Sequence, residues 1–445
     1  MFNPELETLP RKRLRKLQDE RLVRLVHYLY ERVEFYRKQL DRLNIRPDDI
    51  SGIDDMHRLP ITRKSDLRDH YPFGMFAVSK NELRRIHASS GTTGQPTVVG
   101  YTARDLDVFA EVNARSLKAA GAQPGMKLHN AYGYGLFTGG LGLHAGAEKL
   151  GMAVIPVSGG MTDRQIRLLQ DFAPEVICCT PSYAQTLAYE MERRSIDPDH
   201  LALRYAVLGA EPWTETIRQQ VEEGLGVMAT NIYGLSEIIG PGVSQEDVDE
   251  RGRGSHIWED HFYPEVLDPE TGEPLPEGEE GVLVMTTLTK EALPLLRYWT
   301  NDICSLYYDP ESKRSHIKMS PIKGRADDML IIRGVNLFPT QIEELISEID
   351  ELQPYYQLVV SRQGTLDEVV LRVEVDKKFL RVLGLENLEN PPPATKDKLL
   401  ALRSRLIGKI KDNIGLKVKV ELKKYGELIR SEGGKLNRVL DLRNL

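Results

Sequence analysis

The stretch Glu175-Val-Ile-Cys-Cys179 decides the fold class, because it has the pattern of a strand that is apolar on both faces. Three further runs have the same character: residues 127–131, 153–157 and 205–208. Helical patterns lie between these runs, for example at residues 163–172 and 183–194. Strands buried on both faces that alternate with helices are typical of a parallel sheet with covering helices. The sequence therefore predicts an α/β fold with a mainly parallel sheet.

The pattern changes beyond Tyr233. Turn residues fill positions 268–281 and a strand is expected at 282–287, which favours a β-rich, antiparallel subdomain. Beyond residues 324–328 the expected elements, in order, are a helix, two strands, a helix and a strand at residues 340–349, 357–360, 369–375, 396–413 and 417–422. This last region is predicted to be a small α+β domain, so we expect a large domain at residues 1–325 and a small one at 326–445.

The composition excludes several classes of protein. Of the 445 residues, 41% are hydrophobic and 28% are charged, which is typical of a globular chain. No apolar run approaches the roughly 20 residues that a membrane helix needs, and residues 1–15 lack a secretory signal core. The net charge of -7 and the absence of a basic domain argue against nucleic acid binding. Three cysteines without a Cys-x-x-Cys pair favour a reduced, cytoplasmic location.

The loop at residues 89–97 reads Ser-Ser-Gly-Thr-Thr-Gly-Gln-Pro-Thr. Gly91 and Gly94 allow turns that expose backbone N–H groups, and hydroxyl donors are dense around them: Ser89, Ser90, Thr92 and Thr93. Such a loop can surround the oxygens of a polyphosphate. It is not a Walker loop, because it lacks the Gly-Lys-Ser/Thr ending. Gly/Ser/Thr loops in general are often plain surface loops, but here the order of residues is specific.

This loop resembles the phosphate-binding loop of the adenylate-forming superfamily. Further segments are similar to the branch that contains the phenylacetate–coenzyme A ligases: Tyr132-Gly-Tyr-Gly-Leu-Phe-Thr-Gly-Gly140, Gly209-Ala-Glu-Pro-Trp213, Tyr233-Gly-Leu-Ser-Glu237, Trp258-Glu-Asp-His261 and the segment at residues 324–339. The resemblance spans residues 9–442, which is nearly the whole chain.

The resemblance implies an ATP-dependent ligase that joins an aryl carboxylic acid, phenylacetate or similar, to coenzyme A. The reaction would pass through an acyl-adenylate and release pyrophosphate and AMP, with ATP, Mg²⁺ and coenzyme A as cofactor and co-substrates. No zinc is expected, because a zinc-binding, cysteine-rich insertion is missing and its place offers only His256, His261, Cys304 and His316. The expected partners are small molecules, with a homodimer left open as the assembly.

The resemblance also implies which residues bind the nucleotide. The loop at residues 89–94 would bind the phosphates, and Tyr233 would stack on the adenine. The adenine would be bordered by Gly209, Ala210, Glu211, Pro212 and Asn231. The segment at 209–212 follows a buried strand, and open α/β sheets bind ligands at the carboxyl ends of their strands. Asp302 would accept both ribose hydroxyls, and Arg325 would reach the ribose and phosphate region.

The catalytic roles implied by the resemblance fall to Glu237 and Lys435. Glu237 would bind Mg²⁺, since a hard carboxylate oxygen suits that ion. Lys435, on a Gly-flanked loop, would act in the adenylation step. Asp327 would be the hinge of a mobile small domain, and Gly334 would line the tunnel for the pantetheine arm of coenzyme A.

The acid pocket is expected beside residues 132–140. Its predicted walls are Tyr134, Phe137, Gly139, Ala145 and Ile238, with a place in the core as the less favoured alternative for the two aromatic side chains. Three positions depart from the family pattern: Gln95 stands where a Lys is usual, Ala145 where a Tyr is expected and Trp299 where an Arg is usual. These departures leave open an acid other than phenylacetate itself.

Two alternatives remain open at the level of sequence. One is an adenylyltransferase that moves AMP onto a deazaflavin coenzyme and needs no coenzyme A tunnel. The other is a non-catalytic nucleotide sensor, which the joint presence of Asp302, Arg325, Asp327 and Lys435 disfavours.

Overall fold

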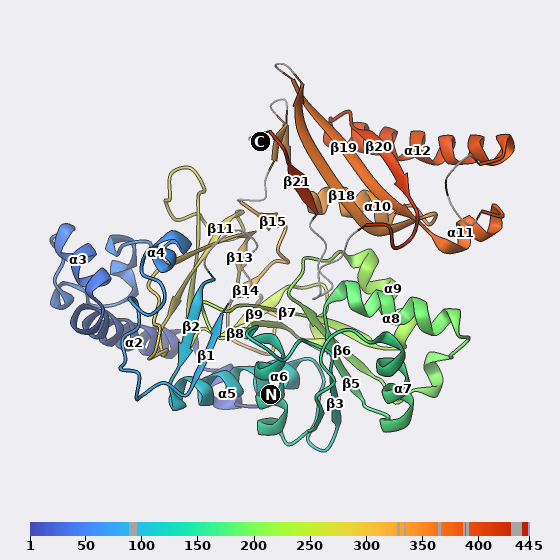
Figure 1. Ribbon diagram of the computed structural model, residues 1–445. Helices are drawn as coiled ribbons and strands as arrows, with labels where there is room; N and C mark the ends of the chain where they lie inside the picture. Colours follow the sequence, from blue (N-terminus) through green and yellow to red (C-terminus); the bar gives the residue numbers. More distant parts are fainter. Residues whose placement is uncertain are drawn as a thin grey trace. The chain divides into compact units, whose positions relative to one another are not determined.

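The computed structural model describes residues 1–88, 96–326, 330–332, 335–363, 366–385, 388, 391–428 and 438–443. It divides into two compact units (Figure 1). The larger unit contains Met1–Glu211 and Gln220–Ile322, and the smaller contains Pro212–Gln219 and Lys323–Leu445. The predicted domain boundary between residues 325 and 326, and the mobility of the smaller domain, stay predictions.

The larger unit is built on one sheet that has nine strands within the described residues. Its parallel part confirms the predicted fold class and comprises β3 (Lys127–Asn130), β4 (Ala153–Ile155), β5 (Val176–Cys179), β6 (Tyr205–Gly209) and β7 (Met228–Leu235). Beyond β7 the sheet continues with antiparallel strands, which are β8 (Gly240–Glu246), β9 (Ser255–Ile257), β14 (Lys318–Met319) and β13 (Leu306–Tyr307). Part of the predicted antiparallel subdomain therefore extends the parallel sheet.

Four helices follow the predicted alternation with the parallel strands: α5 (Ala103–Ala119), α6 (Gly139–Leu150), α7 (Thr162–Phe172) and α8 (Pro181–Arg193). Thr102 caps α5 by accepting from the Asp105 amide, and the Thr180 hydroxyl caps α8 in the same way. Helices α5 and α6 approach closely at Gly146, where an added Cβ would lie 2.3 Å from Cβ of Asn113. This close packing fixes Asn113 beneath the site described below.

A second sheet in the larger unit holds the antiparallel strands β10 (Phe262–Leu267), β11 (Gly281–Thr287) and β12 (Tyr298–Cys304). The N-terminal helices α2 (Arg11–Arg32) and α3 (Glu34–Arg42) share its hydrophobic core, since Leu22, Leu29 and Tyr36 are fully buried. Smaller elements of the same unit are α1 (Pro4–Glu7), α4 (Lys64–Asp69) and the hairpin of β1 (Arg85–Ala88) and β2 (Val98–Tyr101). In the sequence, the two strands of that hairpin flank the loop that is predicted to bind phosphate.

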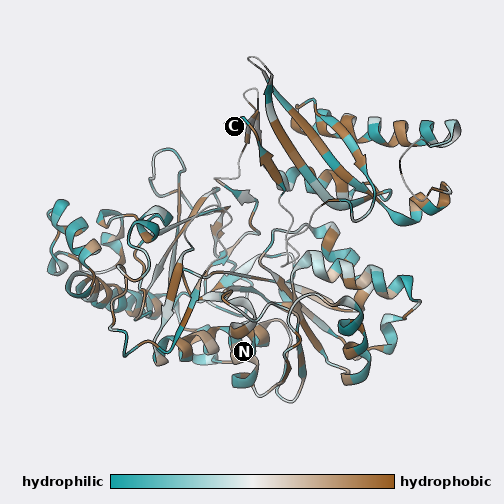
Figure 2. Ribbon diagram, viewed as in Figure 1, coloured by the Kyte–Doolittle hydropathy of each residue, from teal (hydrophilic) through white to brown (hydrophobic). Residues whose placement is uncertain are grey.

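The smaller unit is the predicted α+β region. Its sheet has the order β20 (Lys419–Lys423), β19 (Leu366–Val375), β18 (Leu352–Gln363) and β21 (Val439–Asp441). Its other elements are α10 (Pro339–Ser347), α11 (Lys377–Val382), α12 (Pro393–Ile414), β15 (Gly324–Arg325), β16 (Leu330–Ile332) and β17 (Val335–Leu337). Figure 2 shows apolar and polar turns alternating along α12, whose Leu402, Leu406 and Ile410 join the core of this unit.

Helix α9 (Glu215–Leu225) begins in residues grouped with the smaller unit and ends in the larger one. Over the part of the chain that the structure describes, no helix combines the length and the apolar character needed to cross a membrane.

Candidate active site

The carboxyl ends of β6 and β7 place the first predicted site residues next to one another. Gly209 lies opposite Ile232, and an added Cβ on Gly209 would be 2.2 Å from the Ile232 carbonyl oxygen. Ala210 follows with a φ of +68°, a left-handed conformation that is strained for a residue with a Cβ. Such strain persists where the surroundings enforce it and often marks a functional site.

Two further predicted residues continue this edge. Asn231 lies in β7 opposite Leu208, and its amide donates to the Glu246 carboxylate at 2.9 Å. The Glu211 carboxylate accepts from the Ser182 amide at 3.3 Å, at the start of α8. The residues predicted to border the adenine therefore lie side by side at the ends of the paired strands β6 and β7. Pro212 is the exception, because it falls in the smaller unit.

Tyr233 and Asp302 meet although they lie in different sheets. The Tyr233 hydroxyl donates to Oδ2 of Asp302 at 2.7 Å. Burial and then the neighbouring Asp302 carboxylate raise the pKa of Tyr233 well above its ordinary value, so the phenol remains a donor. Asp302 is 6% exposed, and its amide donates to the Thr300 hydroxyl at 3.0 Å. The residue predicted to stack on the adenine is thus hydrogen-bonded to the residue predicted to bind the ribose. We name Tyr233 and Asp302 the ribose end of the site.

Trp299 lies in β12, the strand that also carries Asp302. Its indole Nε1 donates to Oδ1 of Asn301 at 2.8 Å, and the Arg63 guanidinium lies 4.5 Å from the centre of the ring. The positive charge of Arg63 therefore lies against the Trp299 ring. Trp299 stands where the family pattern predicts an arginine, so Arg63 places a guanidinium near this position.

Glu237 is nearly buried, at 5% exposure, just after β7. Its Oε1 lies 3.4 Å from Nζ of Lys64, the first residue of α4. We name Glu237 and Lys64 the phosphate end of the site. Ser236, the neighbour of Glu237, shares a hydrogen bond of 3.1 Å with the Thr138 hydroxyl, which links this end to the predicted acid pocket.

Sequence reasoning missed Arg63 and Lys64. Arg63 is the N-cap and Lys64 the first residue of a helix of six residues, and no motif surrounds them. Their proximity to Trp299 and Glu237 arises from chain folding over separations of more than 170 residues. No local signal in the sequence could have placed them here.

The predicted acid-pocket residues differ in their surroundings. The half-buried Tyr134 hydroxyl accepts from Asn130 Nδ2 at 2.8 Å and shares a hydrogen bond of 3.1 Å with His144 Nδ1. The Phe137 ring is 39% exposed and covers Gly139, where an added Cβ would lie 2.4 Å from the ring.

Two other acid-pocket residues lie in contrasting positions. Ala145 is half-buried on α6, directly after His144. Ile238 is 1% exposed and belongs to the main hydrophobic core, in one cluster with Ile239 and Phe109. Its predicted role as a wall of the pocket stays a prediction.

Several predicted residues cannot be placed in this site. Arg325 lies in β15 of the smaller unit. Others lie outside the described residues: Ser89, Ser90, Gly91, Thr92, Thr93, Gly94, Asp327, Gly334 and Lys435. Among the residues that the structure does describe, no three or more His, Cys, Asp or Glu side chains are grouped so as to hold a metal ion.

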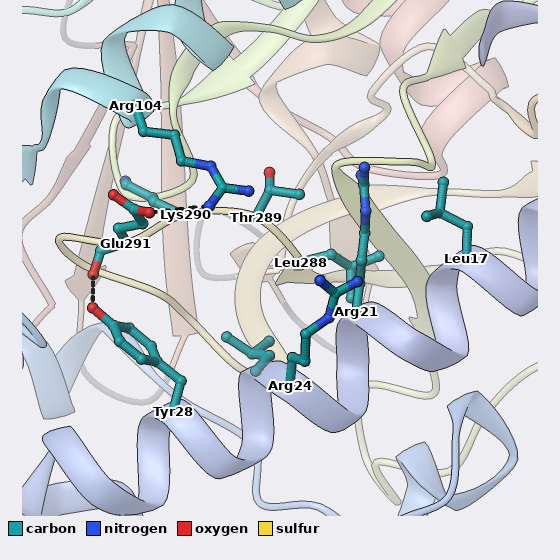
Figure 3. Close-up of a pocket in the computed structure, with 10 residues that line it drawn as sticks. Leu17, Arg21, Arg24, Tyr28, Arg104, Leu288, Thr289, Lys290 and Glu291 are labelled. Atoms are coloured by element: carbon teal, nitrogen blue, oxygen red, sulfur yellow. Dashed lines mark hydrogen bonds and ion pairs between the residues drawn. The ribbon is translucent and has the colours of Figure 1, made fainter. Parts of the chain in front are cut away.

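A cavity of about 300 Å³ in the larger unit contains none of the predicted site residues (Figure 3). It lies between α2, the start of α5 and the loop after β11, and is lined by Leu17, Arg21, Arg24, Leu25, Tyr28, Arg104, Leu288, Thr289, Lys290 and Glu291.

Comparisons with known proteins identify the family of this chain. Residues 27–288 match the model of the family described as AMP-binding enzyme, and residues 334–443 match that of the AMP-binding enzyme C-terminal domain. A phenylacetate-coenzyme A ligase of Thermus thermophilus is 66% identical over 444 residues, covering 100% of both chains.

Solved structures of a 2-hydroxyisobutyryl-CoA ligase are also similar. One, in the postadenylation state with an acyl-AMP, is 27% identical with a TM-score of 0.88, covering 98% of this chain and 91% of that one. Another, in the thioesterification state with acyl-AMP and CoA, is 28% identical with a TM-score of 0.71, covering 99% and 92%. This chain therefore belongs to the adenylate-forming AMP-binding enzymes, in the family of the phenylacetate–coenzyme A ligases.

Proposed function

We propose that this enzyme joins phenylacetate, or an aryl acid close to it, to coenzyme A through an acyl-adenylate. The observation that carries the proposal is the hydrogen bond between Tyr233 and Asp302, because it unites an aromatic face for adenine with a buried carboxylate for ribose. The names of the relatives support phenylacetate as the acid and coenzyme A as the acyl acceptor. The comparisons do not favour transfer of AMP to a deazaflavin.

In the first half-reaction a carboxylate oxygen of the acid attacks the α-phosphorus of ATP. A new oxygen–phosphorus bond forms, and the bond to pyrophosphate breaks. The strip at Gly209, Ala210 and Glu211 borders the adenine, Tyr233 stacks on it, and Asp302 accepts both ribose hydroxyls. Because two anions must approach each other, most of the work is alignment and neutralisation of charge.

Glu237 fits a role in binding Mg²⁺. Its carboxylate is nearly buried and lies 3.4 Å from the Lys64 ammonium, which helps to hold it at a defined place. Mg²⁺ commonly takes one or two protein carboxylates together with phosphate oxygens, and when bound it would neutralise charge on the pyrophosphate. Lys64 supplies a further positive charge at the same end of the site.

The acid would lie beside Tyr134 and Phe137, with the glycines of residues 133–140 allowing close approach of a flat ring. The Phe137 ring is 39% exposed, so it would offer its accessible side to the acid. The small side chain of Ala145 leaves room for a substituent on the ring, so substituted arylacetic acids are expected substrates as well.

In the second half-reaction the sulfur of coenzyme A attacks the adenylate carbonyl, a thioester forms and AMP leaves. We propose that the smaller unit turns about Asp327, which withdraws Lys435 and brings Gly334 to the pantetheine arm. The existence of separate postadenylation and thioesterification states in the 2-hydroxyisobutyryl-CoA ligase supports such a change. Arg325 would then act from the junction on the ribose and phosphates.

A screen of acids tests the proposal. Pyrophosphate release is measured with phenylacetate, substituted arylacetates, benzoate, cinnamate and fatty acids, with and without coenzyme A. We expect the highest kcat/KM with a monocyclic aryl acid, and AMP release that depends on coenzyme A. A preference for long-chain fatty acids would refute the assignment of the acid pocket. AMP release without coenzyme A would refute the assignment of coenzyme A as the acyl acceptor.

Location and assembly belong to the same proposal. The three cysteines are free and buried, which supports a reducing, cytoplasmic compartment. Homodimer formation is tested by light scattering on the eluting protein at several concentrations, and a mass of one chain at all of them would exclude it.

A further inference from the structure

The short segment that carries Glu237 is held from behind by buried side chains. Three alternate main-chain carbonyls accept from side-chain donors that come from three different parts of the larger unit. Nζ of Lys290 donates to the Glu237 carbonyl at 3.0 Å, the Tyr101 hydroxyl to the Ile239 carbonyl at 2.8 Å, and Nδ2 of Asn113 to the Pro241 carbonyl at 2.9 Å.

Water cannot replace these donors. Tyr101 and Asn113 are fully buried and Lys290 is 5% exposed. The Lys290 ammonium also lies 5.1 Å from the centre of the Tyr101 ring, so the first two donors support each other. Because a buried carbonyl that loses its partner is costly, each donor constrains the path of this segment strongly.

Lys290 is itself held in place by its neighbours (Figure 3). The figure shows Glu291, the next residue, between Arg104 and Tyr28. The Arg104 guanidinium pairs with the Glu291 carboxylate at 3.2 Å, and the Tyr28 hydroxyl donates to the Glu291 carbonyl at 3.2 Å. The Glu291 amide donates to the Asp105 carboxylate at 2.7 Å, which ties the same loop to the start of α5.

We propose that Lys290, Tyr101 and Asn113 are positioning residues that fix the main chain of Glu237, and so set where its carboxylate receives the metal ion. The inference rests on the proposed role of Glu237. These donors reach the carbonyl side of the segment, so they act through Glu237 and do not touch the nucleotide. Residues that orient a metal ligand in this way typically contribute about 10- to 100-fold to metal affinity or activity.

Two variants remove the donors in different ways. Lys290→Met keeps the length of the side chain and removes its charge and N–H groups, whereas Tyr101→Phe removes a single hydroxyl. The control is Lys80→Met, at an exposed lysine of the same unit. Tyr101→Phe is the milder change, so it carries the test if Lys290→Met fails to fold.

The first measurement is hydrogen–deuterium exchange in the full chain without ATP, acid or metal. Amides of residues 235–242 are expected to exchange at least 10-fold faster in Lys290→Met and measurably faster in Tyr101→Phe, with the control unchanged. The second is the Mg²⁺ concentration for half-maximal ATP–pyrophosphate exchange. We expect it to rise about 10- to 100-fold in Lys290→Met, while kcat at saturating Mg²⁺ stays within a few-fold.

Unchanged exchange at residues 235–242 in both variants would overturn the inference, and so would an unchanged Mg²⁺ requirement. Glu237→Gln separates this failure from failure of the proposed function. If Glu237→Gln raises the Mg²⁺ requirement and Lys290→Met does not, the positioning role is wrong. If Glu237→Gln leaves the requirement unchanged, the metal role of Glu237 is wrong, and with it the inference.

Discussion

Asp302 and Glu237 are both nearly buried carboxylates of the same site, but the protein holds them differently. The Asp302 side chain is oriented directly, by the Tyr233 hydroxyl at 2.7 Å. The Glu237 side chain has a longer contact, 3.4 Å to Lys64, while its main chain is fixed by the buried Lys290. At the ribose end, the orientation of the Asp302 side chain itself is thus fixed. At the phosphate end the main chain of Glu237 is fixed, and its carboxylate has the ion pair with Lys64.

Lys435 should show the largest effect, because we propose that it acts in the adenylation step, when the two anions are brought together. In Lys435→Ala, ATP–pyrophosphate exchange is expected to fall about 10²- to 10³-fold, the usual result of losing one positioned donor. Capture of a supplied acyl-adenylate by coenzyme A should remain near normal. Lys424→Ala, at an exposed lysine of the same unit, is the control. Equal loss of both half-reactions would remove Lys435 from this role.

Lowering the pH should destabilise the region around the loop of Lys290, which supports the phosphate end. Burial lowers the pKa of His261 from 6.5 to about 4, and the side chain contacts the loop of Lys290 through Thr289 at 2.8 Å. The charged groups that face it are Asp260, Arg115, Arg21 and Glu111.

Since the folded protein holds His261 neutral, its contribution to stability is complete above pH 6.5. This contribution is lost as the pH falls from 6.5 towards about 4. The total loss of stability is roughly 3 kcal/mol, at 1.36 kcal/mol per pKa unit. The unfolding midpoint of the larger unit, followed by tryptophan fluorescence, should therefore fall more steeply over this range in the natural protein than in His261→Gln. Parallel pH curves would contradict the assignment.

Asp302→Asn tests the ribose end alone. Loss of a charged acceptor for the ribose hydroxyls should cost roughly 1.5–3 kcal/mol, which is about 10- to 100-fold in kcat/KM for ATP. The Mg²⁺ requirement should not change, because Asp302 does not reach the phosphates. If Mg²⁺ dependence shifts as much as ATP dependence, the two ends are not separate.

Lys64→Met should give the opposite pattern. Removing this cation is expected to lower the rate of pyrophosphate exchange about 10-fold, equivalent to roughly 1.4 kcal/mol, with a clear change in Mg²⁺ dependence. Lys64→Arg should restore part of the loss, since it returns the charge with a different geometry. A variant that behaves like the natural protein at all Mg²⁺ concentrations would show that Lys64 only pairs with Glu237 in the absence of ligands.

Tyr233→Phe should have the smallest effect. It removes the hydroxyl that orients Asp302 but keeps the aromatic face for the adenine, so we expect a loss of about 1 kcal/mol, or 5-fold, in kcat/KM for ATP. Tyr233→Leu, which also removes the face, is the matched comparison and should lose clearly more. Equal losses would mean that the hydroxyl, and not the ring, makes the contribution of this residue.

The sequence predicted the parallel strands β3, β4, β5 and β6 but not β7, and there is a physical reason for the success. Strands such as Val176–Cys179 are buried on both faces, so their apolar runs are continuous and bounded by turns. It did not reveal that β8 and β9 extend this sheet while β10 to β12 form another. Strand partners depend on packing between distant segments, and periodicity within one strand carries no information about them.

The same distinction holds for the site. Resemblance named Tyr233 and Asp302 separately, but their hydrogen bond joins residues 69 positions apart in two sheets. Lys64 and Lys290 carried no motif, because a lysine becomes significant only through the groups that folding brings to it. Ile238, expected at the pocket wall, is buried in the core with Ile239, and its role in the pocket stays a prediction.

The acyl-adenylate itself is the central claim, and isotope transfer tests it most directly. Phenylacetate labelled with ¹⁸O in its carboxylate is incubated with the enzyme, ATP, Mg²⁺ and coenzyme A, and the products are analysed by mass spectrometry. Because a carboxylate oxygen attacks the α-phosphorus, one ¹⁸O should appear in the phosphate of AMP and one should remain in the thioester. AMP without label, or label in pyrophosphate or inorganic phosphate, would contradict the account.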